Sequence, residues 1–172
     1  MTDARDRAQA VRLAVFDVDG VFTDGRLYYT AEGEEIKVFH VRDGVGIKAL
    51  QRAGIAVAVI SGRASDAVAL RMSELGVSRV FQGDHDKSPL LDALLDQLGM
   101  DATETAFVGD DLPDLPVLRR VGLAACPADA HEEVRSVCHW VGTADGGRGA
   151  VREFCDFLVA CRTESGSRGN GS

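Results

Sequence analysis

The sequence predicts an α/β fold in which a central parallel sheet is flanked by helices. Apolar runs of strand length alternate with amphipathic helical stretches over most of the chain, and a glycine follows most of these helical stretches, where helices commonly end. Strands that alternate with helices pair in parallel, because each helix returns the chain to the same edge of the sheet. With 172 residues, 45% of them hydrophobic, the chain is long enough for one domain with its own core.

The first predicted strand ends on two acidic residues. Residues 11–16 form an apolar run of strand length, and Asp17 and Asp19 follow it, with Gly20 and Gly25 allowing sharp turns. Burying a carboxylate is costly unless a cation or hydrogen-bond donors accompany it, and ligands bind at the carboxyl ends of strands in α/β sheets. We therefore expect a Mg²⁺ and phosphate site here. This motif alone leaves an acidic surface turn as an alternative.

The next segment, residues 26–41, is predicted to be a β-hairpin. Two β-rich runs, RLYYT and IKVFHV, flank the glycine-containing turn AEGEE. Its place between the first strand and the first long helix puts it above the carboxyl edge of the sheet. Because an isolated hairpin is only marginally stable, we expect it to pack on something else, such as copies of itself.

Helices and strands then alternate up to residue 161, so we assign residues 1–162 to a single domain. Helices are predicted at residues 43–53, 64–75, 86–98, 113–121, 130–137 and 148–161. Strands are predicted at residues 55–60, 79–82, 105–108, 123–125 and 138–141. We expect the polar residues 1–9 to be frayed and the Ser/Gly-rich tail, residues 163–172, to be disordered.

Composition and charge exclude several classes of protein. The formal net charge of −8 argues against nucleic acid as the main partner, since phosphate backbones bind basic surfaces. The longest apolar run, residues 55–60, is too short to span a bilayer, and residues 1–12 lack the apolar core of a secretory signal. We therefore expect a cytoplasmic protein that binds neither nucleic acid nor membrane. The four cysteines form no CxxC pair and are expected to be buried free thiols.

Polar side chains also follow three of the later strands. They are Ser61, Lys87, Asp110, Asp111 and Asp114. In a parallel sheet these strand ends lie on one side, so the groups can meet Asp17 there. Carboxylate oxygens are the ligands that Mg²⁺ prefers, and we expect them from Asp17 and Asp110, with Asp111 or Asp114 as a possible third.

The remaining groups have complementary chemistry. Ser61 offers a hydroxyl at the start of a helix, where an anion is favoured, and Lys87 offers a compact positive charge for a phosphoryl oxygen. Asp17 can act as a nucleophile and Asp19 as a general acid and base. Taken singly, Ser61 would be a helix cap and Lys87 a solvated surface lysine. Their position at successive strand ends favours a shared site.

Four motifs in this order resemble those of the haloacid dehalogenase-like phosphatases: FDVDGVFTDG, SGR, Lys87 and VGDDLPD. Three further stretches, GEEIKVFHVRDGVGIK, FQGDHDK and GGRGAVREFCD, are similar to the 3-deoxy-D-manno-octulosonate 8-phosphate (KDO 8-P) phosphatase family. The resemblance covers about residues 13 to 158. It implies the Rossmann-like fold of that superfamily, with a hairpin insertion and no cap domain. It also implies hydrolysis of KDO 8-P to KDO and phosphate, in lipopolysaccharide precursor synthesis.

The resemblance further implies a mechanism. Asp17 would attack the phosphorus and become an aspartyl phosphate. Asp19 would protonate the leaving sugar oxygen and then activate water. Mg²⁺ would be held by Asp17, the backbone carbonyl of Asp19 and Asp110, while Ser61 and Lys87 would steady the transferring phosphoryl group.

The resemblance also carries over a set of substrate contacts, several of them basic, as suits a substrate with a carboxylate and a phosphate. They are Asp19, His40, Val41, Arg42, Asp43, Gly44, Lys48, Arg63, Arg71 and Lys87. Many relatives have arginine at position 48, so Lys48 would lose bidentate geometry. Position 40 varies among relatives, and we do not expect His40 to be catalytic. Arg71 could equally be an exposed helix residue.

The family forms tetramers in which hairpins meet and a C-terminal segment covers a neighbour's site. In this chain the resemblance makes Gly147, Arg148 and Gly149 a possible lid over the neighbouring subunit, although an ordinary loop before the last helix is the alternative. Deleting the chain from Gly142 onward would then leave a folded but altered phosphatase.

Three other functions compete with this interpretation. A signalling receiver domain also uses acids, Mg²⁺ and a lysine, but its lysine comes after the phosphoacceptor strand, late in the chain, whereas Lys87 precedes Asp110. A non-catalytic assembly domain would not need Asp19. A phosphatase of a nine-carbon sugar acid 9-phosphate would carry the same catalytic residues, and the sequence does not separate the two sugars.

Overall fold

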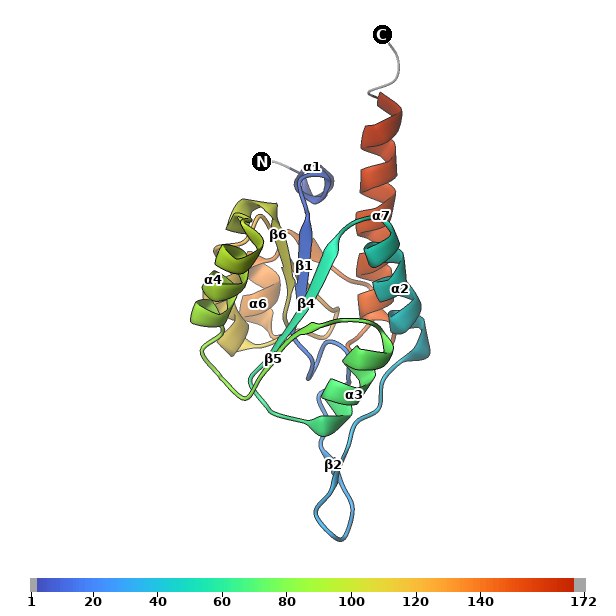
Figure 1. Cartoon of the computed structure of the whole chain (residues 1–172), viewed down its shortest axis with the longest axis vertical. Coiled ribbons are helices and arrows are strands. Elements are labelled where there is room, and N and C mark those ends of the chain that lie inside the picture. Colours follow the sequence, from blue (N-terminus) through green and yellow to red (C-terminus); the bar gives the residue numbers. More distant parts are fainter. Residues whose placement is uncertain (1–2, 169–172) are drawn as a thin grey trace.

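The computed structural model describes residues 3–168. Its centre is a six-stranded parallel sheet in the order β5, β4, β1, β6, β7, β8 (Figure 1). The strands are β1 (Leu13–Phe16), β4 (Ala56–Ser61), β5 (Arg79–Gln82), β6 (Thr105–Val108), β7 (Leu123–Cys126) and β8 (Trp140–Val141). The parallel α/β fold predicted from the sequence is therefore confirmed.

Strand β1 lies in the middle of the sheet, between β4 and β6. Its last residue, Phe16, is level with Val59 of β4 and Val108 of β6. Because the three strands run in the same direction, the residues after them emerge at one edge. Asp17 leaves β1 at this edge, where its backbone N–H still donates to the carbonyl of Val108 at 2.9 Å.

Helices cover both faces of the sheet, with a hydrophobic cluster beneath each layer (Figure 1). One layer holds α1 (Ala4–Gln9), α2 (Val41–Arg52), α3 (Asp66–Glu74) and α7 (Ala150–Arg168). The other holds α4 (Lys87–Leu98), α5 (Leu115–Leu118) and α6 (Glu132–Val137). Two 3₁₀ turns, η1 (Ala102–Glu104) and η2 (Leu112–Asp114), precede β6 and α5. Burial on both faces explains why β1 is a continuous apolar run.

Helices α2 and α7 pack closely because position 46 is a glycine. A Cβ added to Gly46 would lie 3.0 Å from Cys155 Cβ and 3.1 Å from Arg152 Cα. Asp43, buried near the start of α2, accepts a hydrogen bond of 2.9 Å from the backbone N–H of Arg152. This bond pairs one of the N–H groups that the first turn of any helix leaves free. The last helix is thus joined to α2 by both packing and capping.

The expectation that the first nine residues are frayed is wrong for the described part. Residues Ala4–Gln9 form α1, where Ala8 is 2% exposed. Arg7 donates a hydrogen bond of 2.7 Å to the carbonyl of Gly122. These tertiary contacts hold a segment whose polar sequence gives little sign of order.

The tail expected to be disordered begins at residue 163, and in the structure α7 continues to Arg168. Adding residues to an established helix gains a hydrogen bond for each residue fixed, so a packed helix can extend past its buried part. The hydroxyl of Thr163 bonds back to the carbonyl of Ala160 at 2.9 Å. Residues 169–172 lie outside the described part of the chain.

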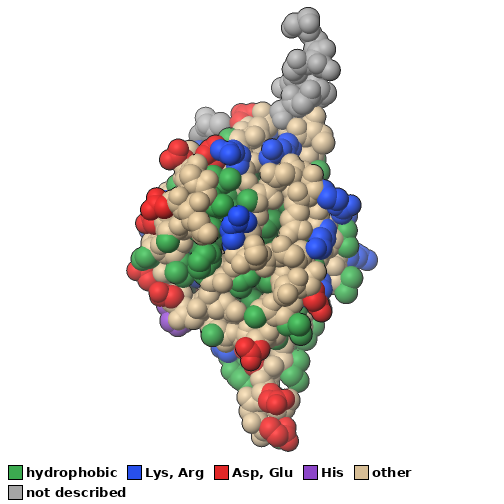
Figure 2. Space-filling view, viewed as in Figure 1, with side chains coloured by type: hydrophobic (Ala, Val, Ile, Leu, Met, Phe, Trp, Pro, Cys, Tyr) green, Lys and Arg blue, Asp and Glu red, His purple; other side chains and the backbone are tan. Residues whose placement is uncertain are grey.

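The predicted hairpin is present but has short strands. β2 (Tyr28–Tyr29) and β3 (Glu35–Ile36) pair antiparallel and project from the body of the molecule (Figure 1). Figure 2 shows acidic side chains at its tip. Large apolar side chains of the hairpin are exposed, and they are Leu27, Tyr28, Tyr29, Ile36 and Val38. The chain itself therefore leaves part of the hairpin's apolar surface uncovered.

The cysteines agree with the sequence-based prediction of unbridged thiols. Cys126, Cys155 and Cys161 are buried, Cys138 is half-buried, and none of the four forms a disulfide within residues 3–168.

The burial of α7 changes the expected outcome of truncation. Val151, Phe154 and Leu158 are fully buried, so deletion from Gly142 onward removes one wall of the core. Loss of a single large core side chain costs about 2–5 kcal/mol, while a whole domain has about 5–15 kcal/mol of stability. We therefore expect the truncated chain to show no cooperative thermal transition by circular dichroism. A sharp transition in that chain would contradict this and restore the idea of a removable lid.

Candidate active site

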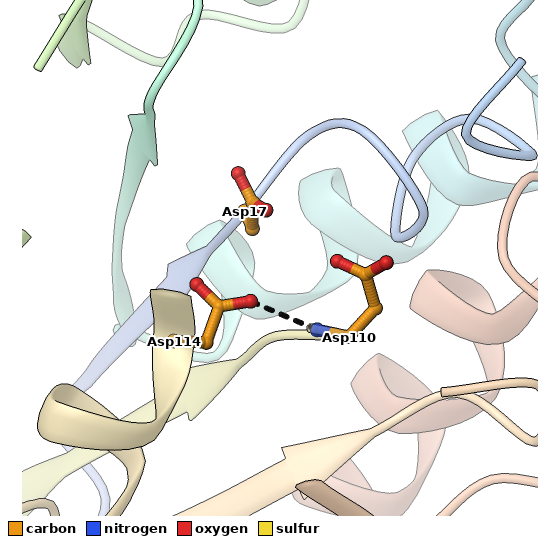
Figure 3. A group of neighbouring side chains, drawn as sticks. All are labelled: Asp17, Asp110 and Asp114. Carbon is orange, nitrogen blue, oxygen red and sulfur yellow. Dashed lines mark hydrogen bonds between the residues drawn. The ribbon is translucent and has the colours of Figure 1, made fainter. Parts of the chain in front are cut away.

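Lys87 links two carboxylates at the carboxyl edge of the sheet. Its ammonium lies 3.0 Å from Asp17 Oδ2 and 2.6 Å from Asp114 Oδ1, and its side chain is 4% exposed. The other oxygen of Asp114 accepts the backbone N–H of Asp110 at 2.9 Å (Figure 3). Burial opposes the charged form of Lys87, but the two carboxylates outweigh it and raise its pKa. Asp114 therefore orients both the lysine and the loop that carries Asp110.

Asp110 reaches the site because position 20 is a glycine. Gly20 has φ +82°, and a Cβ there would overlap the carboxylate of Asp110. An L-residue is strained at this φ as well. One oxygen from each of Asp17, Asp110 and Asp114 lies within 4.8 Å of the others. The turn after β1 therefore needs a residue without a side chain at position 20, so that the Asp110 carboxylate can lie beside Asp17.

The pKa values of Asp17 and Asp110 are raised, because burial and neighbouring carboxylates outweigh the nearby positive charge of Lys87. Burial, together with Asp114, raises the pKa of Asp17 to about 7 against the opposing effect of Lys87. Burial, with Asp17 and then Asp114, raises the pKa of Asp110 to about 8. Since Asp114 already binds Lys87 and backbone N–H groups, Asp17 and Asp110 are the pair whose hard oxygens suit a divalent cation such as Mg²⁺.

The raised pKa values predict how stability responds to pH and metal. Between about pH 4 and pH 7 the folded protein holds protons on Asp17 and Asp110 that the unfolded chain has released, so their contribution to stability falls as the pH rises. A cation that binds the ionised pair reverses this loss. We expect Mg²⁺ to raise the Tm more at about pH 8 than at about pH 6, measured by calorimetry against chelator. An equal or larger rise at the lower pH would contradict the assignment.

A cavity of about 280 Å³ opens above these groups. Its lining includes Ser61, which is 2% exposed at the end of β4, and Gly62 and Arg63 after it. The full lining is Asp17, Asp19, Gly25, Ser61, Gly62, Arg63, His85, Lys87, Asp110, Asp111, Pro113 and Asp114. Residues at the ends of β1, β4 and β6 thus line the same cavity. Lys87, at the start of α4, also lines it.

Asp19 lies in the same cavity but is held from the hairpin side. Its carboxylate forms an ion pair with Lys37 and lies 3.7 Å from Arg63 Nε. Asp111 is less involved, because it is exposed and its carboxylate accepts the N–H of Leu112 at 2.8 Å to cap η2.

Two residues in or near the cavity were not expected from the sequence. His85 lines it, and a Cβ on Gly62 would come within 2.7 Å of the His85 ring, so the glycine allows the two loops to meet. Lys37 follows β3 and pairs with Asp19. The motif FQGDHDK contains His85, in the loop between β5 and Lys87, and GEEIKVF contains Lys37, after a strand of the hairpin and not of the parallel sheet.

The start of α2 and the residues beside it lie outside the cavity lining just given. His40 caps α2 by accepting the N–H of Arg42 at 3.3 Å, and Val41 is 77% exposed. Asp43 and Gly44 are buried against α7 and Arg71, respectively.

The two remaining expected contacts on helices also lie elsewhere. Arg71 donates to Glu74 at 3.1 Å, and the Lys48 amine lies beside Gly76. Of the expected sugar contacts, only Asp19, Arg63 and Lys87 line the cavity of this chain.

The possible lid packs against the active-site turn of its own chain. The N–H of Gly147 donates to the carbonyl of Val21 at 3.0 Å, and a Cβ on Gly146 would overlap the carbonyl oxygen of Gly20. Arg148 lies 3.9 Å from Asp24, and Gly149 at φ +105° leads into α7. Within one chain this loop therefore supports the turn that holds Gly20.

Comparison with known proteins finds relatives over nearly the whole chain. The model of the haloacid dehalogenase-like hydrolases matches residues 39–122. The KDO 8-P phosphatase of Yersinia pestis is 43% identical over 157 residues, which cover 91% of this chain and 84% of that protein.

Solved structures of relatives also match nearly the whole chain. The KDO 8-P phosphatase of Moraxella catarrhalis, in complex with magnesium ion, phosphate ion and a KDO molecule, has a TM-score of 0.91 at 38% identity and matches 96% of this chain and 95% of its own. The cobalt-bound deoxy-D-mannose-octulosonate 8-phosphate phosphatase of Haemophilus influenzae has a TM-score of 0.88 at 42% identity, over 92% of this chain and 93% of its own.

Proposed function

This chain belongs to the KDO 8-P phosphatase family of the haloacid dehalogenase-like hydrolases, and we propose that the cavity at the carboxyl edge of its sheet is the active site. The protein is a phosphoric monoester hydrolase that converts KDO 8-P into KDO and inorganic phosphate, with Mg²⁺ as its cofactor. The observation that supports the proposed site most strongly is the convergence of Asp17, Lys87 and Asp110 on one small cavity.

The side chains divide the reaction between them. A carboxylate oxygen of Asp17 attacks the phosphorus, the bond from phosphorus to the sugar oxygen breaks, and Asp19 gives a proton to that oxygen. Asp19 then takes a proton from water as the water attacks the aspartyl phosphate, which frees phosphate and Asp17. Ser61 and Lys87 hold the phosphoryl oxygens during both steps.

The metal ligands in this proposal are Asp17, the backbone carbonyl of Asp19 and Asp110. Held by these groups, Mg²⁺ would supply positive charge that offsets the negative charge of the phosphoryl group during transfer. The fit rests on the two buried carboxylates, whose pKa values are raised by burial and by neighbouring carboxylates, and on their hard oxygen donors.

The sugar contacts of the proposal fall into two groups. Arg63 lines the cavity and is placed to meet the sugar acid directly. The others are His40, Val41, Arg42, Asp43, Gly44, Lys48 and Arg71, which lie outside the cavity of their own chain. We propose that the exposed members of this group act in an assembly of several copies.

That assembly is proposed to be a homotetramer built on the apolar surface of the hairpins, with Gly147, Arg148 and Gly149 near a neighbouring site. Exposed Tyr29 and Val38 support this, because a hairpin of this size is poorly stable without a partner surface. Light scattering of the purified protein measures the number of copies directly. Within residues 3–168, no helix has the length and apolar character needed to cross a membrane. We propose a cytoplasmic location.

A phosphate-release panel tests the proposed function. It compares KDO 8-P with a nine-carbon sugar acid 9-phosphate, each with Mg²⁺ and with chelator. We expect the highest kcat/KM for KDO 8-P, and activity only with the metal. Preference for the nine-carbon substrate, or undiminished activity in chelator, would overturn the proposal.

A further inference from the structure

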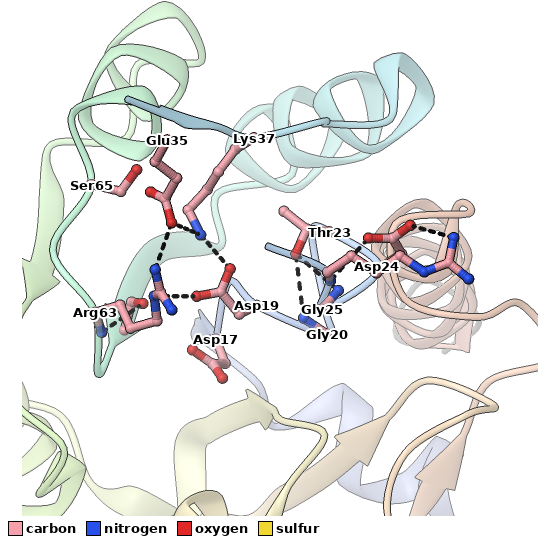
Figure 4. A network of polar contacts seen from close by, with 12 residues as sticks. Asp17, Asp19, Gly20, Thr23, Asp24, Gly25, Glu35, Lys37, Arg63 and Ser65 are labelled. Atoms are coloured by element: carbon pink, nitrogen blue, oxygen red, sulfur yellow. Dashed lines mark hydrogen bonds and ion pairs between the residues drawn. The ribbon is translucent and has the colours of Figure 1, made fainter. Parts of the chain in front are cut away.

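A buried lysine of the hairpin contacts the carboxylate proposed as the general acid and base. Lys37, just after β3, has a side chain that is 3% exposed, although the hairpin around it is largely exposed. Its ammonium pairs with Asp19 Oδ1 and lies 3.5 Å from Glu35 Oε1 (Figure 4). A buried ammonium needs an opposite charge beside it, and Asp19 and Glu35 both supply one.

Arg63 forms ion pairs with the same two carboxylates, Asp19 and Glu35. It donates to Glu35 Oε1 at 2.7 Å, and its Nε lies 3.7 Å from Asp19 Oδ2. The two carboxylate oxygens of Asp19 therefore face different cations, Lys37 and Arg63 (Figure 4). Glu35 lies between the same two cations and fixes them relative to each other.

The turn that contains Asp19 does not fix this side chain by itself. Asp19 lies beyond the end of β1 and precedes Gly20, which has a positive φ. In contrast, Asp17 is held by Lys87 and by its backbone bond to Val108. The orientation of Asp19 therefore comes from the hairpin and from Arg63.

We propose that Lys37 is a positioning residue that holds the Asp19 carboxylate where it can reach the oxygen of a sugar leaving group. The proposal rests on the function proposed above. It makes the hairpin part of the catalytic apparatus, since the lysine that orients Asp19 and the glutamate that braces it both come from β3 or directly after it.

Two substrates with different leaving groups separate this role from others. A sugar alkoxide needs a proton as it leaves, whereas p-nitrophenolate leaves without one, so only the first depends on a well-placed acid. For Lys37→Met we expect kcat/KM with KDO 8-P to fall about 100-fold, the loss typical of a catalytic group misplaced by about 1 Å. With p-nitrophenyl phosphate we expect little change. Lys37→Arg keeps the charge and should recover much of the loss.

Other outcomes would overturn the proposal. Equal losses with both substrates, or no loss with either, would show that Lys37 does not act through the leaving group. A rise in KM for KDO 8-P at unchanged kcat would make Lys37 a sugar-binding residue instead. Arg26→Gln is the matched control, because Arg26 is an exposed cation that begins the hairpin segment and lies outside the cavity lining. The Arg26→Gln variant should leave kcat/KM unchanged with both KDO 8-P and p-nitrophenyl phosphate.

Two further points keep the result interpretable. If Lys37→Met does not fold, Glu35→Gln replaces it, and the same loss confined to KDO 8-P is expected because Glu35 braces Lys37 and Arg63. An absence of that selective loss overturns the proposal. The wild-type protein separates the two hypotheses. If it does not hydrolyse KDO 8-P, the proposed function is wrong. If it does, but the variants keep the wild-type ratio of kcat/KM for KDO 8-P to kcat/KM for p-nitrophenyl phosphate, only the role of Lys37 is wrong.

Discussion

Replacing Asp17 with asparagine should lower phosphate release from KDO 8-P by about 10⁴-fold or more, because the amide cannot attack phosphorus as the carboxylate does. The variant should nevertheless fold. Asparagine has nearly the same shape, and a neutral group at this position relieves the burial and repulsion that raise the pKa of Asp17. Lys87 keeps Asp114 as its partner at 2.6 Å. Steady-state phosphate release and a thermal melt measure the two effects.

Asp92→Asn serves as the control for this change. Asp92 is a half-exposed acid on α4 that pairs with Arg120, and neither residue lines the cavity, so the same loss of one carboxylate should leave activity unaltered. Turnover by the Asp17→Asn variant at a tenth of the wild-type rate would exclude Asp17 as the nucleophile. A variant that fails to melt cooperatively would instead assign Asp17 a mainly structural role.

Replacing Gly20 with alanine should abolish most of the affinity for Mg²⁺. The new methyl group would overlap the Asp110 carboxylate, so that Asp110 would have to move away from Asp17. Since two carboxylates supply most of the charge that attracts the ion, losing one from the pair should weaken binding by about 10-fold or more, equivalent to about 1.4 kcal/mol. Calorimetric titration with Mg²⁺ measures this without any substrate.

Gly33→Ala separates the steric effect from backbone strain. Gly33 also has a positive φ, +88°, but a Cβ there meets nothing within 4 Å. Both variants therefore suffer the strain of an L-residue in this region, and only Gly20→Ala disturbs Asp110. If the two variants bind Mg²⁺ equally well, the close approach of Gly20 to Asp110 does not matter for the metal.

The fold was largely predictable because its signals are local. The run that becomes β1 is apolar on both faces, and Asp86 and Gly99 mark the two ends of α4 as a cap and a left-handed glycine. In contrast, the order of α1 depends on contacts such as that from Arg7 to Gly122, which are more than a hundred positions apart. No local pattern reports such a contact.

The candidate site also contains some residues that local sequence patterns could predict and others that they could not. Asp17, Ser61 and Asp110 lie at the ends of strands or within two residues of them, so the direction of the sheet was enough to bring them together. Lys37 belongs to the hairpin, whose position over the sheet is set by tertiary contacts, and its charge suggests a surface residue. Asp43 lies in a conspicuous motif that suggested a sugar contact, and nothing in that motif indicated that it is also buried and caps the start of α7.

The packing of α7 also bears on how the protein is made. Phe154 of this helix stacks edge-on against Phe16, with ring centroids 6.2 Å apart, and Phe16 is the residue immediately before Asp17. A ribosome delivers Phe16 early and Phe154 some 138 positions later (154 − 16), at about 5–20 residues per second. The emerging chain must therefore leave the part of its central strand that Phe154 covers without this contact for several seconds, during which protection by a chaperone would be most useful.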